Sequence, residues 1–412
     1  MRPDKILNLL KEEEKRQEET VNMVASENYP DMRILKAYSS IISNRYSEGY
    51  VGKRYYAGTK VVDKIEGIAV DKVKRLFGSE HANVQPHSGT QANMAVMMSI
   101  LKPGDRILSM DLACGGHISH GNRLSIAANL FKTMHYGVDK KNGRIDYEDV
   151  RKKAIKFKPS LIIAGGSSYP RGIDFKKFRD ICDETGAYLL CDIAHTAGLV
   201  CAGLHQNPCD FADFVTFTTH KSMKGPRGGV ILCKDKYAKQ IDRAVFPGTQ
   251  GGSLNSNIAG KAICFEIAAT GRFKRYIKRV IQNSRILCRL LKERGVNIVT
   301  NGSDTHIILI SLENTNTNGH AVQEALEKAG IMSNKNLIPF DKGSPKKPSG
   351  IRIGTLGLTS RGFTKKDIHR LSEIISYAVK NPEDEDGMIK RKKIVTKICK
   401  KHPIYKRNNK KC

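Results

Sequence analysis

Along the middle of the chain, stretches whose apolar residues recur every three or four positions are interleaved with short runs of consecutive apolar residues. The first pattern predicts amphipathic helices, and the second predicts buried strands. Helices are expected at residues 62–76 and 90–101, and strands at 106–110, 160–164, 188–192, 214–218 and 229–233. Because helices separate the strands, we predict an α/β fold with a mainly parallel sheet that binds ligands at the carboxyl ends of its strands.

Both ends of the chain differ from this middle region. Residues 1–18 show an amphipathic, charged helical pattern, whereas residues 22–60 are irregular and polar, as in segments that line a site. A long helical pattern over 258–291 is followed by the signals of a smaller α+β domain: strands at 297–300, 305–311 and 350–354 and a helix at 365–379. We therefore expect an N-terminal arm (1–60), a large three-layer α/β/α domain (61–270), a small C-terminal domain (271–380) and a basic tail (381–412).

The net charge of +29 over 412 residues raises the question of nucleic-acid binding. Eleven Lys and Arg residues, and no Asp or Glu, fall within residues 388–412, so the tail carries a large share of the excess. Trp is absent and aromatic residues make up 7% of the chain, which argues against a base-stacking surface. We expect the tail to be a solvated appendage and do not expect a nucleic-acid partner.

No run of 18 or more apolar residues occurs, and the N-terminus has no hydrophobic signal core, so we expect a cytoplasmic protein with no membrane partner. The ten cysteines include no CxxC pair, and most lie in apolar runs. This distribution predicts buried thiols rather than disulfides or a zinc site, and we expect no metal.

The strongest chemical signal is Lys221, which follows an expected strand and precedes the glycine-rich turn 225–229. An amine held at the rim of a sheet can form a Schiff base, and the obvious carbonyl is the aldehyde of pyridoxal phosphate (PLP). Asp192, at the end of another strand, can serve the pyridine nitrogen, and Ser88, Gly89 and Thr90 open a helix that can hold the phosphate. Each feature alone has a plainer explanation, as a solvated lysine or a helix cap. Their order and spacing together favour PLP chemistry.

The chain resembles serine hydroxymethyltransferases over residues 20–380. The resemblance rests on several segments: Ala25-Ser26-Glu27-Asn28, Gly52-Lys53-Arg54-Tyr55-Tyr56, Gly115-Gly116-His117, Asp192-Ile193-Ala194-His195, Thr219-His220-Lys221 and Gly350-Ile351-Arg352. It implies PLP fold type I, the aspartate-aminotransferase fold, with a smaller C-terminal domain. It also implies reversible interconversion of serine and glycine with transfer of the one-carbon unit to a reduced pterin.

The resemblance also implies roles for single residues. Lys221 would form the Schiff base, with His220 beside it; Asp192 would keep the pyridine nitrogen protonated; and His117 would stack on the ring. The remaining cofactor contacts would come from Ser88, Gly89, Thr90, Ser167 and His195. Arg352 would bind the carboxylate of the amino acid as a bidentate pair, assisted by Ser26.

In this family, part of the site comes from a second subunit, so the resemblance implies an obligate homodimer. The contributing residues would be Tyr46, Glu48, Tyr56, Gly251 and Gly252. Glu48 would carry out acid–base chemistry at the substrate hydroxymethyl group and the pterin. Without the resemblance, Glu48 would be a surface carboxylate paired with Arg54 or Lys53.

The pterin side departs from the bacterial folate-using pattern. Residues expected there are Leu112, Gly116, His117, Ile118, Asn336 and Lys346. Cys114 stands where that pattern has His, and Lys346 stands where it has an aromatic residue. These changes favour an archaeal-like variant that uses tetrahydromethanopterin rather than tetrahydrofolate. The alternatives are a pterin-independent aldolase acting on threonine or allo-threonine and, more remotely, an RNA-binding protein.

Overall fold

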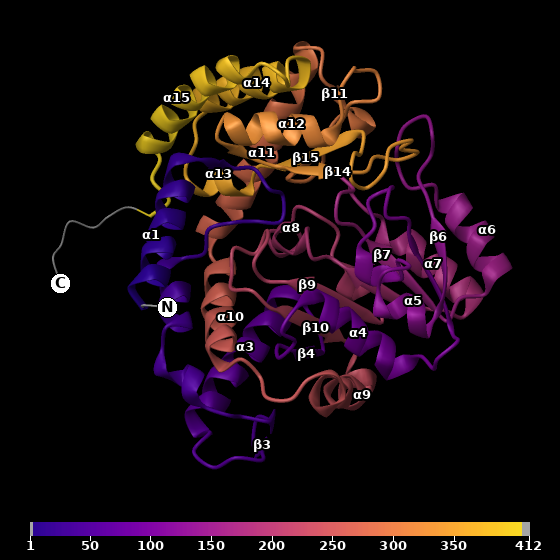
Figure 1. Ribbon diagram of the computed structural model, residues 1–412. Helices are drawn as coiled ribbons and strands as arrows, with labels where there is room; N and C mark the ends of the chain where they lie inside the picture. Colours follow the sequence, from indigo (N-terminus) through magenta and orange to yellow (C-terminus); the bar gives the residue numbers. More distant parts are fainter. Residues whose placement is uncertain (1–2, 406–412) are drawn as a thin grey trace. The chain divides into compact units, whose positions relative to one another are not determined.

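The computed structural model describes residues 3–405, which divide into two compact units (Figure 1). Residues up to Tyr29 and from Arg279 onward form the first unit, and Pro30–Lys278 form the second. The start of the chain belongs with its C-terminal part because β1 (Val21–Asn22) pairs in parallel with β13 (Ile331–Met332). The units therefore differ from the sequence-based division, which joined residues 1–29 to the rest of the arm and began the small domain at residue 271.

The second unit contains a seven-stranded sheet in the order β4-β10-β9-β8-β7-β5-β6. Its strands are β4 (His81–Asn83), β5 (Arg106–Met110), β6 (Lys132–Tyr136), β7 (Leu161–Gly165), β8 (Tyr188–Asp192), β9 (Phe214–Thr218) and β10 (Gly229–Cys233). Strands β5 to β9 run parallel, and β10 is antiparallel to both of its neighbours. The predicted α/β class with a mainly parallel sheet is confirmed, and four of the five expected strands have the expected bounds.

Helices cover both faces of this sheet. Consecutive residues of a strand point to opposite faces. Phe214 joins the core cluster that contains Ala92 and Val96 of α4 (Gly89–Ile100). Phe217, three positions on, packs its ring 5.0 Å from that of Phe77 in α3 (Lys60–Phe77). The layers are therefore helix, sheet and helix, which explains why every residue of β7, β9 and β10 is buried, whichever face it points to.

The other helices and short strands of the second unit are α2 (Met32–Tyr38), β2 (Gly49–Tyr50), β3 (Lys53–Arg54), α5 (Ile126–Leu130), α6 (Tyr147–Phe157), α7 (Phe175–Thr185), α8 (Ala197–Cys201), α9 (Ala238–Arg243) and α10 (Asn255–Ala268). The single helical region expected over 258–291 is two helices, α10 and α11 (Gly271–Glu293). The break falls where the Thr270 hydroxyl accepts a hydrogen bond from the backbone N–H of Phe273 at 3.3 Å, as an N-cap does.

The first unit has a four-stranded antiparallel sheet in the order β11-β12-β15-β14. The strands of this sheet are β11 (Asn297–Ile298), β12 (Ile307–Ser311), β14 (Asn334–Asn336) and β15 (Gly350–Gly354). The helices of this unit include α1 (Pro3–Glu19), α12 (Gly319–Lys328), α13 (Leu356–Ser360), α14 (Lys365–Lys380) and α15 (Glu385–Lys401). One core cluster joins the sheet to its helices through residues such as Leu287, Ile310, Leu326 and Ile375. The expected α+β character of this part is present.

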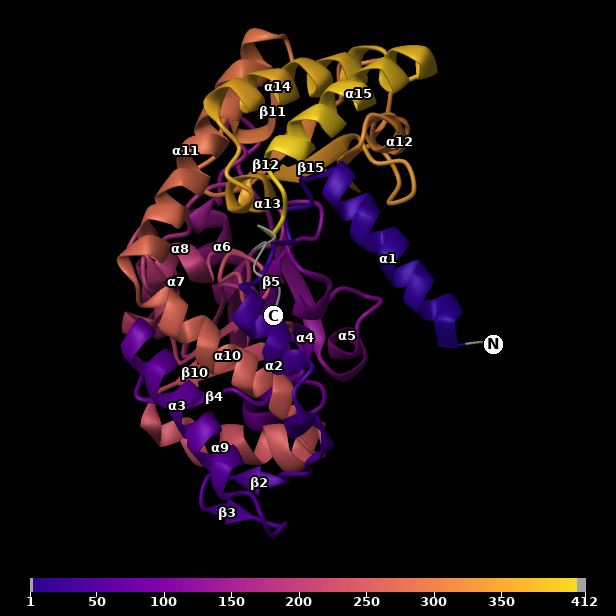
Figure 2. The same ribbon diagram turned by 90° about the vertical axis from the view of Figure 1, so that its left-hand side faces the viewer.

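The basic C-terminal segment is mostly not a solvated appendage, which corrects the expectation for residues 381–401. Helix α15 packs against α1, α12 and α14 within the first unit (Figure 2). Its apolar side chains Met388, Val395, Ile398 and Cys399 are buried in the core, while its lysines lie on the other side. The apolar residues recur at helical spacing, a signal that the high charge of the segment masks.

Arg361 connects the ends of α1 and α15 through hydrogen bonds. Its buried guanidinium donates to the carbonyl oxygens of His402 at 2.6 Å, Thr20 at 2.7 Å and Glu18 at 2.9 Å. It also reaches the carbonyl of Cys399 at 3.2 Å. These carbonyls lie at the C-terminal ends of two helices, where no partner within the helix is available.

We expect Arg361→Ala to lower the free energy of unfolding by about 3 kcal/mol, because it leaves several buried carbonyls without donors. Urea denaturation followed by circular dichroism measures this change. The control is Arg370→Ala, whose exposed pair with Glu373 should contribute about 0.5 kcal/mol or less. Equal effects of the two substitutions would contradict the assignment.

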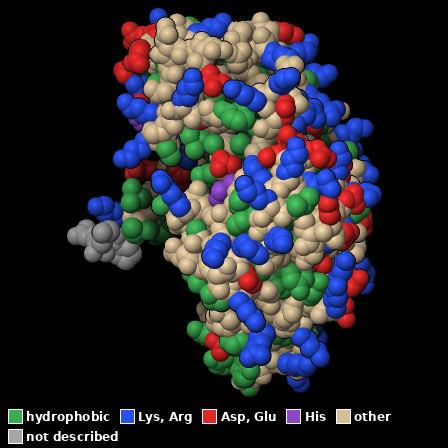
Figure 3. All heavy atoms as spheres, turned by 90° about the vertical axis from the view of Figure 1, so that its right-hand side faces the viewer, with side chains coloured by type: hydrophobic (Ala, Val, Ile, Leu, Met, Phe, Trp, Pro, Cys, Tyr) green, Lys and Arg blue, Asp and Glu red, His purple; other side chains and the backbone are tan. Residues whose placement is uncertain are grey.

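Among the residues that the structure describes, no helix is both long and apolar enough to cross a bilayer. On the face that Figure 3 shows, Lys and Arg side chains are spread among acidic and neutral ones rather than gathered in one patch. The cytoplasmic location and the absence of a nucleic-acid partner stay predictions.

Candidate active site

Lys221 lies in a tight loop between β9 and β10 and is 8% exposed. The loop is closed by backbone hydrogen bonds from Gly225 to the Thr219 carbonyl at 2.7 Å and from Thr219 to the Gly228 carbonyl at 3.2 Å. Such closure holds the lysine amine at the carboxyl end of the parallel sheet, away from bulk water. This is the environment that the sequence predicted for a Schiff-base lysine.

Asp192 ends β8, the strand next to β9, and its carboxylate is surrounded by donors. Its Oδ2 accepts hydrogen bonds from Asn93 Nδ2 and from His120 Nε2, each at 2.8 Å. Its Oδ1 accepts from the backbone N–H of Ala194 at 2.9 Å. Burial raises the pKa of Asp192, but the hydrogen bonds and the nearby histidines outweigh it and hold that pKa well below its ordinary value. The carboxylate therefore stays ionised.

The same network reaches His117. Asn93 Nδ2 also donates to Ser119 Oγ at 3.0 Å, and Ser119 Oγ lies 2.8 Å from His117 Nδ1. The loop that carries His117 is joined to the loop after β7, because the backbone N–H of Ser167 donates to the Gly115 carbonyl at 2.6 Å. Polar contacts thus link the ends of β5, β7 and β8 at one edge of the sheet.

Asn93, Ser119 and His120 belong to this site and were not predicted from the sequence. Asn93 and His120 are 1% exposed, and Asn93 also accepts from Thr216 Oγ1 at 2.5 Å. One signal was available, because Asn93 interrupts the apolar face of this helix. A buried amide requires partners, although the sequence does not say which ones.

The expected phosphate cradle is the N-terminus of α4. Ser88 is its N-cap, and its side chain accepts a hydrogen bond from the backbone N–H of Gln91 at 3.1 Å. Ser88 and Thr90 are exposed. A Cβ on Gly89 would lie 2.7 Å from Thr218 Cγ2, so only glycine allows the helix end to approach β9 this closely.

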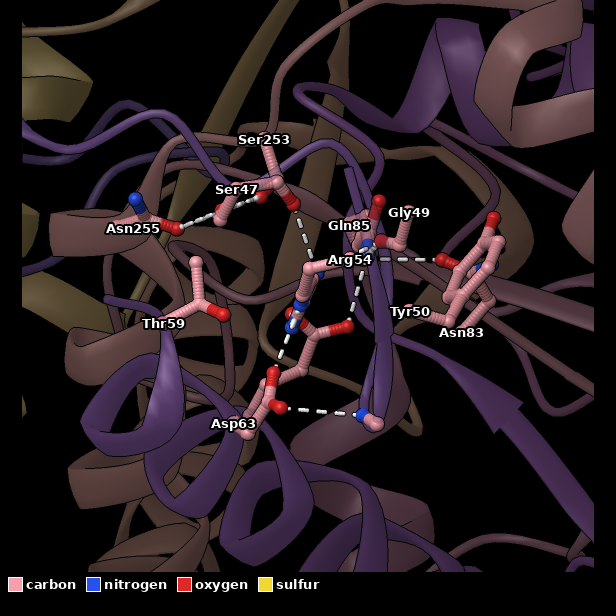
Figure 4. A network of polar contacts seen from close by, with 12 residues as sticks. Ser47, Gly49, Tyr50, Arg54, Thr59, Asp63, Asn83, Gln85, Ser253 and Asn255 are labelled. Atoms are coloured by element: carbon pink, nitrogen blue, oxygen red, sulfur yellow. Dashed lines mark hydrogen bonds and ion pairs between the residues drawn. The ribbon is translucent and has the colours of Figure 1, made fainter. Parts of the chain in front are cut away.

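Glu48 is not paired with Arg54, one of the two cations that the simpler explanation of this carboxylate names. The buried Arg54 guanidinium binds Asp63 at 2.7 Å (Figure 4). The guanidinium also binds Glu66 at 2.6 Å. It also donates to the carbonyls of Ser47 and Gly49. Ser47 in turn donates to Asn255 Oδ1 at 2.6 Å, so the arm is held firmly on α3 and α10 (Figure 4).

This rigid arm presents Tyr46, Glu48 and Tyr56 together. The rings of Tyr46 and Tyr56 lie 5.4 Å apart, and the Tyr56 hydroxyl lies 3.4 Å from Glu48 Oε2. Gly251 and Gly252 lie against the same group, because a Cβ on Gly252 would be 2.9 Å from the Tyr46 ring. The five residues that the resemblance assigns to a neighbouring subunit's site therefore form one cluster. Tyr46 is 60% exposed.

Arg352 and Ser26 both belong to the first unit. Arg352 lies on β15, and its Nε donates to Asn334 Oδ1 at 3.0 Å. Burial lowers the pKa of Arg352 to about 10, which still leaves the guanidinium charged at neutral pH. The segment that carries Ser26 packs on the end of the same strand, where the backbone N–H of Gly354 donates to the Met23 carbonyl at 2.7 Å.

The residues expected to meet a pterin are distributed over both units. Leu112, Gly116 and Ile118 lie on the loop after β5, and the Ile118 side chain is 49% exposed. Asn336 ends β14, and Lys346 is exposed on the loop 337–349. Asp341 holds this loop in place, because its carboxylate accepts from Gly343, Ser349 and Ile338.

The two remaining predicted residues, His195 and His220, flank the strand ends. His195 is 2% exposed in the loop after β8. Burial of the ring, together with the neighbouring Lys221 ammonium, lowers the pKa of His220 to about 3. His220 is therefore neutral at physiological pH.

This depressed pKa predicts an acid-dependent loss of stability. Because the pKa of His220 is about 3 in the folded chain and 6.5 when unperturbed, its contribution is complete above pH 6.5 and falls as the pH drops toward 3. When the pH is lowered from about 7 to about 4.5, the free energy of unfolding should fall in the parent protein. In His220→Gln this fall should be smaller, by up to about 2 kcal/mol. Urea denaturation of the apoprotein measures it, with the exposed His369→Gln as control. Identical losses in all three proteins would refute the assignment.

Seven of the nine cysteines that the structure describes are buried, as predicted, and none of the nine is in a disulfide. Within residues 3–405, no group of three metal-ligating side chains is present.

The donor set of the second unit fits PLP: a buried amine, a buried carboxylate kept ionised, and a helix N-terminus for the phosphate. Fold and site together define a PLP-dependent enzyme of fold type I. The family model of serine hydroxymethyltransferase matches residues 1–375, and the chain belongs to that family. Its members are PLP-dependent glycine hydroxymethyltransferases that act on serine and glycine with a folate-type one-carbon carrier.

Proposed function

We propose that this enzyme interconverts serine and glycine with Lys221 as the residue that binds PLP covalently and with tetrahydromethanopterin as the preferred one-carbon carrier. One observation supports the role of Lys221 in particular. The neighbouring strands β8 and β9 end side by side, with the ionised Asp192 at the end of β8 and the buried Lys221 just after β9. When bound, PLP supplies an electron sink for the electrons released as the Cα–Cβ bond of serine breaks.

The residues of the second unit set the charge state of the cofactor. Asp192, which Asn93 and His120 keep ionised, would accept a hydrogen bond from the protonated pyridine nitrogen of PLP. His117 would stack on the PLP ring, and its contact with Ser119 orients the imidazole. The phosphate of PLP would bind at the positive end of α4, to Ser88, Gly89 and Thr90. The oxygen on the PLP ring would lie beside His195 and Ser167.

Residues other than these cofactor contacts bind the substrate and transfer its proton. Arg352, with Ser26, binds the substrate carboxylate through parallel N–H donors. Glu48 moves the proton of the hydroxymethyl group, with Tyr56 as its neighbour at 3.4 Å.

We assign Tyr46, Glu48, Tyr56, Gly251 and Gly252 to the site of a second subunit in a homodimer. Two observations support this assignment: they form one cluster, and the arm exposes large apolar side chains, with Tyr55 77% and Ile41 86% exposed. Exposed aromatic and aliphatic side chains on a rigid segment are typical of a surface that another chain covers.

The choice of carrier rests on the loop 337–349. Lys342, Lys346 and Lys347 are all exposed there, on a backbone held by Asp341. A cluster of ammonium groups suits a carrier whose tail bears phosphate and carboxylate, and tetrahydromethanopterin has both. Leu112, Gly116, His117, Ile118 and Asn336 contact the pterin ring in this proposal.

The test measures serine turnover with each carrier at equal concentrations. We expect a higher kcat/KM with tetrahydromethanopterin, and Lys346→Phe should reduce that preference about tenfold while leaving kcat for aldol cleavage of allo-threonine unchanged. Equal use of tetrahydrofolate would overturn the carrier assignment alone. Cleavage of allo-threonine without turnover of serine by either carrier would overturn the proposed function in favour of an aldolase.

A further inference from the structure

Lys261 is a buried lysine on α10, 1% exposed, that the chemistry described above does not use. Its Nζ donates to three backbone carbonyls: Val84 at 2.6 Å, Gly229 at 2.8 Å and Pro86 at 3.2 Å. An ammonium has three N–H groups, so these carbonyls match its full donor capacity.

The three carbonyls belong to two segments that build the cofactor site. Residues 84–86 lead from β4 directly into His87 and Ser88, the start of the phosphate cradle. Gly229 is the first residue of β10, immediately after the loop that carries Lys221. The segments also meet directly, since the backbone N–H of Gly229 donates to the Pro86 carbonyl at 2.9 Å. Lys261 therefore lies where the cradle and the lysine loop join.

The backbone at this junction is adapted to the lysine. Gly228 has a φ of 155°, and a Cβ there would lie 2.5 Å from Lys261 Cε and 2.7 Å from its Nζ. A Cβ on Gly229 would overlap the carbonyl oxygen of Ser88. Any side chain at these glycines would push the lysine loop away from the cradle or displace the ammonium.

Burial lowers the pKa of Lys261 to about 7, so the ammonium form with three N–H donors is favoured below that pH. The acidic group that acts on it is Glu66 of α3, which is already bound by Arg54 at 2.6 Å and by Gln85 at 2.7 Å. Burying an ammonium costs several kcal/mol, and a methionine would fill the same space without that cost. The cost is offset by the three hydrogen bonds that tie the two segments together and, in part, by the charge of Glu66.

We propose that Lys261 is a positioning residue that sets the spacing between the phosphate cradle at Ser88 and the loop of Lys221, so that one PLP molecule can be held by both. The inference rests on the proposed role of Lys221. It assigns Lys261 no contact with the cofactor and no proton transfer.

The experiment compares Lys261→Met with Lys224→Met, a lysine of the same loop whose Nζ lies over the Tyr276 ring, 5.2 Å from its centroid. Three quantities are measured: urea unfolding of the apoprotein, the Kd for PLP by fluorescence titration, and the fraction of protein that borohydride links to PLP at saturation. We expect Lys261→Met to raise the Kd at least tenfold and to lower the linked fraction. Lys224→Met should change neither by more than twofold.

Gly228→Ala provides a second route, because it crowds the ammonium without removing it. It should also weaken PLP binding, because the added methyl group displaces the Lys261 amine from its three carbonyls. If Lys261→Met does not fold, the Kd of Gly228→Ala decides the question. Parental Kd and linkage in the folded variants would overturn the inference. A parent protein that borohydride does not link to PLP at Lys221 would instead overturn the proposed function.

Discussion

Lys221→Gln is expected to abolish serine turnover, with kcat reduced at least about 10³-fold, because glutamine cannot form or exchange an imine. Lys221 is the lysine buried in the loop at the carboxyl end of the sheet, in a backbone closed by Thr219, Gly225 and Gly228. Glutamine preserves most of its volume and its polarity, so the fold should survive.

Two measurements check this prediction. Steady-state kinetics gives the loss of turnover, and mass spectrometry after borohydride treatment gives the position of the PLP adduct. In the parent protein the adduct should lie on Lys221, and in the variant it should be absent. Lys224→Gln, three residues further along the same loop, is the matched control and should keep both. An adduct that persists in Lys221→Gln would mean that another lysine holds the cofactor.

Asp192→Asn should lower kcat by about 10³-fold, the second largest effect that we expect, because the neutral amide cannot stabilise a protonated pyridine nitrogen. The carboxylate receives three hydrogen bonds, from Asn93, His120 and Ala194. An amide NH₂ at the same position would face two of these donors, so PLP binding should also weaken.

The visible spectrum of the PLP complex and its kcat together test this prediction. Asp192→Asn should shift the spectrum toward the form with an unprotonated ring, whereas the exposed Asp210→Asn should leave it unchanged. His120→Phe, which removes one donor but keeps the carboxylate, should have a smaller effect of about tenfold on kcat. A fully active Asp192→Asn would contradict the role given to this carboxylate.

The sequence pattern was most informative where local chemistry and burial agree. Strands β5, β8, β9 and β10 were predicted at their observed bounds, because each is a mostly apolar run that is buried on both faces along most of its length. Lys221, Asp192 and Ser88 stand at the ends of regular elements, and turn glycines or helix-capping residues mark such ends in the sequence.

Other features depend on partners that are distant in the sequence. Asn93 and Asp192 are 99 positions apart and meet only because α4 packs on the sheet. Arg54, Lys261 and Arg361 look like ordinary surface cations in the sequence, and their burial follows from acceptors supplied by other elements. The high charge of residues 385–401 hid an amphipathic helix whose apolar face is covered by α1, α12 and α14.

The sequence by itself determined the fold class, the family, the PLP chemistry and the position of the lysine loop, because these follow from local periodicity and from motifs within short segments. Only the tertiary structure decided which groups keep Asp192 ionised, which carboxylates hold Arg54 and leave Glu48 available, and which carbonyls bind Lys261. The physical reason is that pKa values and buried hydrogen bonds depend on distances between side chains from separate elements, and packing alone sets those distances.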